Sequence, residues 1–346
     1  MKRPRTVAEC INRGIIYFVF VIIALFVIYP LIYVVSAAFS QGNSIADLSI
    51  VPFTFETDRI VAETEDGLVI ESNDQIDSQI LDSDEALAEN VENSKRSISP
   101  EFSYTREITD VKTGETIIQK AFTLEHFKYL FTQTNYGRWF LNTFIIALGT
   151  CILTVIISSL TAYTLSRFKF TFKKPFMLSL LVLQIFPSFV GMIAIYVILM
   201  RIGGLDTLWG LILVYTAGNV PYNTWMVKNY MDTISKNLDE AARIDGAGNF
   251  RTFWQIIMPV ARPIIVFLAI TSFTGPWMDF IFPKMVLRSA EKQTLAIGLF
   301  TFVSDKNNNF TTFAAGSLII AIPFVIFFMI TQKTLITSFG SAAVKE

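Results

Sequence analysis

Few side chains in this sequence are suited to catalysis. Its one histidine, His126, is flanked by Leu124 and Phe127 at helical spacing, which indicates an ordinary residue of an amphipathic helix. Its two cysteines, Cys10 near the N-terminus and Cys151 inside an apolar run, cannot meet to form a disulfide or a metal site. The sequence contains no Gly-x-x-x-x-Gly-Lys-Ser/Thr phosphate-binding loop. We therefore expect no catalytic residue, no metal site and no bound cofactor, and we expect that the chain is not an enzyme.

The segment 235–259 has the pattern of two short helices that meet at a glycine turn. Asn237 can cap the first helix, and an acidic first turn that includes Glu240 suits the positive end of the helix dipole. Two alanines after Glu240 keep this helix slim enough for another surface to approach it closely. Gly246 then ends the helix and allows a turn.

A second short helix is predicted after that turn, capped by Asn249 and ended by Pro259. Its large apolar residues form a stripe at helical spacing: Phe250, Phe253, Trp254 and Ile257. We expect this helix pair to be presented to a partner rather than buried in lipid. An amphipathic loop that simply lies on the membrane face is the alternative.

Polar residues are unevenly spread over the apolar runs of the sequence. Those deep inside two of the runs are Gln184, Asn219, Tyr222 and Asn223. Polar groups at that depth must face protein or water, so they either form hydrogen bonds between helices or line a substrate pathway. Both interpretations stay open. Asp279 lies near the end of another run beside Trp277, where we expect its carboxylate to reach the membrane interface.

The composition places these segments in a membrane protein. Hydrophobic residues make up 52% of the chain and charged residues 16%, against about 25% charged residues in typical soluble domains. A helix needs roughly 20 apolar residues to cross a hydrocarbon core of about 30 Å. Six runs meet this length: 15–39, 140–164, 176–200, 208–227, 260–283 and 312–331. The first run lacks a small-residue cleavage pattern, so we expect it to be a retained span rather than a signal peptide.

Basic residues predict how these runs cross the membrane. Lys and Arg cluster before the first run, after the second and after the fourth, and the positive-inside rule places all three clusters in the cytoplasm. With six spans, both termini are then cytoplasmic, as the segments 1–14 and 335–346. Residues 40–138 lie outside, and residues 139–334 form a core of five spans.

The predicted outside segment 40–138 is acidic. Residues 41–138 hold 19 Asp and Glu against 8 Lys and Arg. Asp66-Gly67 and Thr113-Gly114 each stand between β-leaning runs and predict two β-hairpins. The polar residues 73–100 between them cannot bury much surface. We expect a small external domain, which is either a solvated decoration or a docking site for an external partner.

The loop 235–259 resembles a known family signature. It is similar to the EAA motif of ABC importer permeases, with Met258 where leucine is usual. The shared pattern is Glu-Ala-Ala, three residues, Gly, nine residues, Ile, one residue, a large apolar residue and Pro. The resemblance implies the all-α, polytopic type I importer permease fold, in which this helix pair couples the spans to an ATPase. The residues concerned are Glu240, Ala241, Ala242, Asp245, Gly246, Ile256 and Pro259.

The resemblance covers about 15–52 and 122–346, and the chain looks like the smaller permease subunit of maltose and maltodextrin importers. The further similar segments are Phe39–Asn43, Leu183–Pro187, Gln293–Gly298, Asn309–Ala315 and Phe339–Lys345. In that family the last outside loop contacts a solute-binding protein, whereas its alternative here is a plain polar connector. Its residues are Ser304, Asp305, Lys306, Asn307, Asn308 and Asn309.

The resemblance also implies the partners. They are a second permease subunit, a homodimeric ATPase that binds ATP and Mg, an extracytoplasmic solute-binding protein and the lipid bilayer of a bacterial cytoplasmic membrane, with no nucleic acid. We expect an importer of oligosaccharides, with a permease for another sugar or small solute as the alternative. An ATP-independent secondary transporter would show internal repeats and paired intramembrane charges, which this sequence lacks. A membrane-anchored sensor would not need six spans.

Overall fold

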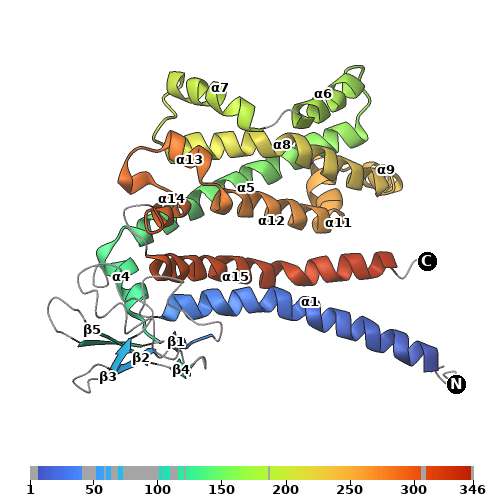
Figure 1. Cartoon of the computed structure of the whole chain (residues 1–346). Helices are drawn as coiled ribbons and strands as arrows, with labels where there is room; N and C mark the ends of the chain where they lie inside the picture. Colours follow the sequence, from blue (N-terminus) through green and yellow to red (C-terminus); the bar gives the residue numbers. More distant parts are fainter. Residues whose placement is uncertain are drawn as a thin grey trace. The chain divides into compact units, whose positions relative to one another are not determined.

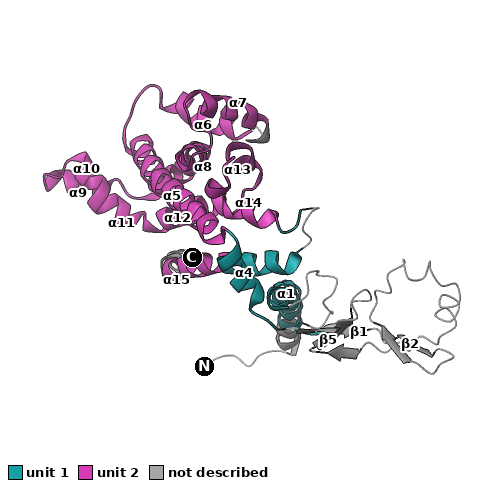
Figure 2. Cartoon of the chain, turned by 90° about the vertical axis from the view of Figure 1, so that its left-hand side faces the viewer, with its two compact units in different colours: residues 1–134, 302–319 teal, residues 135–301, 320–346 magenta. Residues whose placement is uncertain are grey.

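The computed structural model describes residues 7–40, 52–57, 60–63, 69–72, 101–103, 105–109, 116–120, 122–185, 188–304 and 309–343. The chain divides into two compact units, which Figure 2 shows in different colours. One unit comprises residues 1–134 and 302–319, and the other comprises residues 135–301 and 320–346. The last helix, α15 (Phe310–Ala343), contributes to both units.

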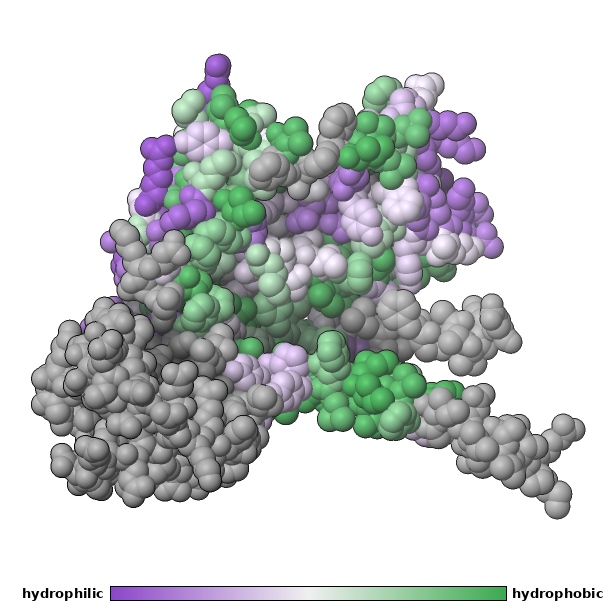
Figure 3. All heavy atoms as spheres, in the orientation of Figure 1, coloured by the Kyte–Doolittle hydropathy of each residue, from purple (hydrophilic) through white to green (hydrophobic). Residues whose placement is uncertain are grey.

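Helix α1 (Val7–Phe39) is apolar on all sides. Its side chains from Ile16 to Ile32 are largely exposed, and Figure 3 shows them as a green band. Residues Ile16–Phe39 are long and apolar enough to cross a membrane. A helix with this surface suits lipid or another apolar surface rather than water.

Within the described residues, six short strands form three antiparallel pairs. They are β1 (Phe55–Thr57) with β4 (Glu101–Ser103), β2 (Ile60–Glu63) with β3 (Val69–Ser72), and β5 (Thr105–Thr109) with β6 (Thr116–Lys120). The second and third pairs confirm the two predicted hairpins. Their turn residues, and the polar stretch 73–100, lie outside the described residues.

His126, on helix α4 (Glu125–Gln133), forms hydrogen bonds to two other segments of the first unit. Its side chain is buried, and Nε2 lies 2.7 Å from the Ser40 carbonyl oxygen while Nδ1 lies 2.8 Å from Thr312 Oγ1. Because a carbonyl only accepts, Nε2 carries a proton, and burial lowers the pKa of the ring below its ordinary value. The predicted helix is confirmed, but the burial of His126 was not predicted, because helical spacing does not show which side of α4 other elements cover.

Three helices pack side by side at the centre of the second unit: α5 (Tyr136–Arg167), α8 (Leu208–Thr233) and α12 (Arg262–Met278), as Figure 1 shows. The buried side of α5 carries small residues at helical spacing: Thr143, Ala147, Thr150, Thr154, Ser158 and Ala162. Small side chains let neighbouring helices approach closely. At Gly149 a Cβ atom would lie 2.8 Å from Ile212 Cδ1 of α8, so a side chain there would displace the end of the Ile212 side chain.

Two of the six apolar runs are bent rather than continuous. The run 176–200 is divided into α6 (Lys173–Ile185) and α7 (Ser188–Arg201), with a change of direction of 107°. One uninterrupted helix was the wrong expectation for this run, because Pro187 lacks an N–H and disfavours helix in the residue before it. Residues 186–187 themselves lie outside the described residues.

The run 260–283 also differs from its prediction. Helix α12 ends at Met278, and a separate short helix, α13 (Ile281–Val286), follows. Asp279 lies between them, where it accepts hydrogen bonds from Tyr215 Oη (2.9 Å) and from the Phe282 N–H (3.4 Å). Its carboxylate is thus half-buried against protein groups, rather than dependent on the membrane interface alone.

Among the described helices, three are long and apolar enough to span a membrane alone, or five if each bent pair counts as one span. These three are α1, α5 and α15, which begin at or near the predicted bounds. Helix α8, which corresponds to the run 208–227, is not among them. It has 26 residues, and the polar side chains that lower its hydropathy include buried Thr216, Asn223 and Thr224.

The segment after α13 is fastened to the start of α5. It contains a 3₁₀ turn (Ala290–Lys292) and helix α14 (Leu295–Phe300). Asn142 Nδ2 donates to the carbonyls of Glu291 (2.8 Å) and Gln293 (3.0 Å). The Trp139 ring lies so close to Gly298 that an added Cβ would be 2.1 Å from Trp139 Cε3. A glycine at this position is therefore required by packing.

Candidate functional site

The segment between α8 and α12 forms two short helices, as predicted from its sequence. The first is α9 (Asn237–Ile244). The Asn237 N–H donates to Ser235 Oγ (3.3 Å), so Ser235 serves this end and Asn237 is already inside the helix. The N-cap is Lys236, so the predicted cap is one residue too late.

Gly246 ends α9 with a left-handed turn. Its φ is +75°, its N–H donates to the Arg243 carbonyl (3.1 Å), and the Ala247 N–H donates to the Ala242 carbonyl (2.8 Å). These two bonds make a Schellman motif, which satisfies the free carbonyls at a helix end and favours glycine at the left-handed position. The sequence therefore encodes this turn at a single residue.

The second helix has three parts: α10 (Asn249–Thr252), a π-helical turn (Phe253–Ile257) and α11 (Met258–Val260). Asn249 is again the first helical residue rather than the cap, which is Gly248. Pro259 lies inside α11 and does not end the helix, contrary to the prediction. Because proline has no N–H and its ring needs room near the preceding turn, the π-helical turn widens the helix just before it. The chain then turns by 82° into α12.

The predicted apolar stripe of the second helix is divided between two sides. Phe253 and Ile257 are buried with Tyr163 of α5 and Met231 of α8. Phe250 and Trp254 point the other way and are 74% and 59% exposed, and Ile244 at the end of α9 is 86% exposed. The helix pair therefore packs one side on the spans and presents large apolar side chains on the other.

A buried arginine joins α9 to the ends of two long helices. Arg167 is the last residue of α5, and its Nε lies 2.8 Å from Asp239 Oδ2 of α9 in an ion pair with side chains only 6% and 12% exposed. Its other nitrogens donate to the carbonyls of Met231 (3.0 Å) and Ile234 (3.1 Å) at the end of α8. The guanidinium thus lies where the negative end of α8 meets the first turn of α9.

A second polar contact supports the same junction. Ser166 Oγ donates to Asp232 Oδ1 (2.6 Å), and Lys228 Nζ lies 2.6 Å from Asp232 Oδ2. The Asp232 carboxylate therefore joins α5 to α8.

Residues 154–337, more than half of the chain and including the whole helix pair, match a family described as "Binding-protein-dependent transport system inner membrane component". The chain belongs to this family. It is therefore an integral, multi-pass permease component of an inner-membrane transport system.

Relatives of known name agree with this assignment. The maltodextrin transport system permease protein MdxG of Bacillus subtilis is 38% identical over 226 residues, which cover 65% of this chain and 81% of the relative. The galactooligosaccharides transport system permease protein GanQ of the same organism is 39% identical over 234 residues, which cover 66% and 83%. A chain of a bacterial ABC transporter involved in the import of alginate shares the fold, with a TM-score of 0.64, 18% identity and coverage of 96% of this chain and 99% of that one.

The permease exposes most of the residues that the EAA resemblance singles out. Those that are exposed are Glu240, Ala241, Asp245, Gly246 and Pro259. Ile256 is half-buried, and Ala242 is only 2% exposed. Ala242 therefore faces the core of its own chain, where its small side chain lets α9 lie close to the spans.

The residues predicted for a substrate pathway lie on two helices. Gln184 is exposed near the end of α6, whereas Asn219, Tyr222 and Asn223 belong to α8. Asn223 is buried and donates to the Asn219 carbonyl of its own helix (2.8 Å), while Tyr222 is 52% exposed. The Asn223 amide is therefore satisfied within α8 rather than across a helix pair, and both interpretations of the group stay open.

Of the residues predicted to contact a binding protein, Ser304 and Asn309 are described and 305–308 lie outside the described residues. Asn309 Oδ1 accepts from the Thr312 N–H and Thr311 Oγ1, both at 3.0 Å. Asn309 thus caps α15, a structural role that the sequence pattern Asn-Phe-Thr-Thr could have indicated.

Sequence reasoning missed Arg167 and Asp239 as a pair. The available signal was a single arginine at the end of an apolar run together with an acidic residue in a loop helix, and no spacing rule connects the two.

Proposed function

We propose that the helix pair 237–260 docks a separate ATPase subunit and that this permease works in an ATP-driven importer of oligosaccharides. The observation that carries the proposal is the two-sided build of the pair. Its inner side is buried against α5 and α8, and its outer side presents Ile244, Phe250 and Trp254 beside exposed Glu240 and Asp245. Exposed aromatic side chains with a few charges are typical of the centre of a protein interface.

Rigid attachment explains how docking would drive transport. A force on the helix pair passes to α5 and α8 through the buried Phe253 and Ile257 and through the Arg167 contacts. Packed elements of this kind move between discrete arrangements rather than deforming continuously. Closure of a homodimeric ATPase, which binds ATP and Mg, would thus move the spans between outward-open and inward-open states. This chain binds neither ATP nor Mg in that scheme.

We place six spans in the membrane, with α8 as the fourth. A 26-residue helix is about 39 Å long at 1.5 Å per residue, which exceeds a hydrocarbon core of about 30 Å. Its polar residues include Thr216, Asn223 and Thr224, which are buried against protein, so they need not meet lipid. Both termini and the helix pair are then cytoplasmic, and the strand-containing insertion is outside.

The remaining partners follow from that orientation. A second permease subunit completes the pathway, in which Gln184, Asn219, Tyr222 and Asn223 are candidates for contact with substrate. An extracytoplasmic solute-binding protein delivers the substrate, with the loop that includes Ser304 and Asn309 as its candidate contact. The names of the relatives support an oligosaccharide such as a maltodextrin as the substrate, with another sugar or small solute as the second candidate.

Substitutions on the outer side of the helix pair test the docking surface. Glu240→Lys and Trp254→Ser should each abolish co-purification of the ATPase and transport, while membrane insertion and yield stay normal, because a hot-spot residue contributes about 2 kcal/mol or more to an interface. Glu125→Lys, the same charge reversal on the predicted outside helix α4, is the control. Normal co-purification and transport with both helix-pair variants would refute the docking assignment.

A binding measurement tests the substrate class separately. The solute-binding protein that works with this permease should be titrated by calorimetry with maltodextrins, galactooligosaccharides and non-sugar solutes. We expect tight binding to one of the oligosaccharides. Tight binding to a non-sugar alone would overturn the substrate class and leave the docking assignment intact.

A further inference from the structure

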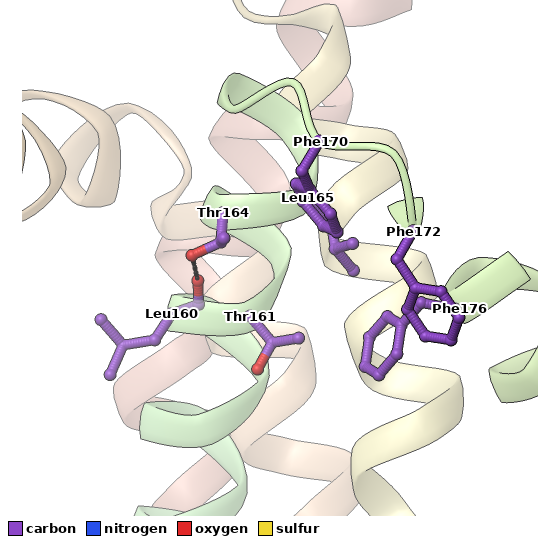
Figure 4. A pocket seen from close by; sticks show the side chains of 7 residues that line it. All are labelled: Leu160, Thr161, Thr164, Leu165, Phe170, Phe172 and Phe176. Atoms are coloured by element: carbon purple, nitrogen blue, oxygen red, sulfur yellow. Dashed lines mark hydrogen bonds between the residues drawn. The ribbon is translucent and has the colours of Figure 1, made fainter. Parts of the chain in front are cut away.

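A groove opens on the second unit between the end of α5 and the start of α6. It encloses about 340 Å³. Leu160 and Leu165 of α5 line it together with Phe170, Phe172 and Phe176 from the connection and from α6. Figure 4 shows the Phe172 and Phe176 rings beside each other on one side of the groove, with Leu160 on the other.

The lining of the groove is mainly apolar, with two threonines, Thr161 and Thr164. The Thr164 hydroxyl donates to the Leu160 carbonyl of its own helix (2.9 Å), so its hydrogen is already engaged. The volume corresponds to about ten methylene-sized groups at roughly 30 Å³ each, the volume that one water takes in the liquid. This is room for a segment of one extended hydrocarbon chain.

Three lysines lie in the same segment as the phenylalanines of this groove. Lys169, Lys173 and Lys174 alternate with the lining phenylalanines in Lys169-Phe-Thr-Phe-Lys-Lys-Pro-Phe176, and none of the three lysines forms an ion pair within the described part of the chain. The carboxylates nearby are already engaged, since Asp232 pairs with Lys228 and Asp239 pairs with Arg167. This segment therefore combines an apolar lining with three lysines, of which Lys169 and Lys174 are exposed while half-buried Lys173 also interacts electrostatically with Asp232.

We propose that this groove binds an anionic phospholipid of the cytoplasmic leaflet. One acyl chain lies along the leucines and phenylalanines, and the phosphate meets the three lysines. The charge pattern favours an anionic headgroup over a zwitterionic one, because each lysine near such a headgroup adds an attraction that a neutral lipid lacks. The chain belongs to an inner-membrane family, and the groove lies at the end of α5, a helix long and apolar enough to cross a membrane. The inference needs the proposed orientation of the spans but not the docking of an ATPase.

Lipid retention by the purified full-length chain tests this proposal. The protein is equilibrated in detergent with dioleoylphosphatidylglycerol or dioleoylphosphatidylcholine, and bound lipid is counted by native mass spectrometry. We expect one phosphatidylglycerol to persist through delipidation and no phosphatidylcholine. Lys169→Gln/Lys173→Gln/Lys174→Gln should weaken retention by roughly five-fold for each lysine, or about 100-fold together.

Two further variants separate charge from groove. Thr161→Trp fills the groove without changing the charge and should also lose phosphatidylglycerol. Lys236→Gln/Arg251→Gln/Arg262→Gln removes three charges on the same predicted side, away from the groove, and should retain it. Equal retention of both lipids by the wild-type chain, or undiminished retention by the triple-lysine variant, would overturn the proposal. So would displacement of the lipid when the second permease assembles, because the groove would then be a subunit interface.

Discussion

Loss of the Arg167 guanidinium should release the helix pair from the spans. In Arg167→Ala, the carboxylate of Asp239, whose side chain is 12% exposed, loses its cation, and the carbonyls of Met231 and Ile234 lose their donors. Removing one partner of a buried ion pair costs about 3–5 kcal/mol. That cost raises the population of a detached α9 by roughly 150-fold to 5,000-fold, at about 1.4 kcal/mol for each factor of ten.

Hydrogen exchange followed by mass spectrometry measures this population directly. Amides of α9 should exchange about two to three orders of magnitude faster in Arg167→Ala, while those in the middle of α5 and α12 keep their protection. Arg167→Lys should recover only part of the loss, because an ammonium cannot serve the carboxylate and two carbonyls with a planar fork. Arg243→Ala, on the exposed side of the same helix, is the matched control. Exchange of α9 within twofold of wild type in Arg167→Ala would refute the role of this contact.

Three shorter predictions concern the turn, the core and the pH response. Gly246→Ala should lower the melting temperature and weaken ATPase co-purification, because a side chain at φ +75° costs about 1–2 kcal/mol. Gly248→Ala should not, because Gly248 has φ −71° and open space around it. Equal effects of the two substitutions would contradict this reasoning. Gly298→Val should destabilise the chain strongly in a thermal melt because it displaces the Trp139 ring, while Gly137→Ala, with no atom within 4 Å, should be neutral. Burial keeps the pKa of His126 below its value in the unfolded chain, so the folded state binds fewer protons. The protection of α4 amides from hydrogen exchange should therefore fall as the pH is lowered from about 7.5 to about 5.5. His126→Gln should lose that pH dependence, and an unchanged dependence would exclude the histidine as its source.

Local patterns predicted much of the helix pair and the insertion. The glycine turn at Gly246 and both hairpins follow from residues that are adjacent in sequence, because their turns are decided by a few backbone angles. The caps of α9 and α10 were each predicted one residue too late, because Lys236 and Gly248 take these positions without a side-chain hydrogen bond and so leave no signal in the sequence.

Features that depend on distant contacts could not be predicted in the same way. The Arg167–Asp239 ion pair joins residues on separate helices, and the burial of His126 depends on α1 and α15 closing over α4. The division of the run 176–200 is different, because Pro187 already stood in the sequence as its signal. Length and hydropathy identify a span but do not show whether it is straight.

The contacts of Arg167 with α8 and α9 can form only in a certain order during synthesis of the chain. During synthesis, residue 167 leaves the ribosome 72 residues before Asp239, so the guanidinium waits through the insertion of α6, α7 and α8 before its carboxylate exists. The α8 carbonyls that it also binds are completed only just before α9. In the proposed topology, the helix pair is therefore fixed in place only after four spans have been inserted. A chain that ends before α9, or that misplaces α5 or α8, cannot form this junction, so a partner that docks as proposed would recruit only chains whose first four spans are in place.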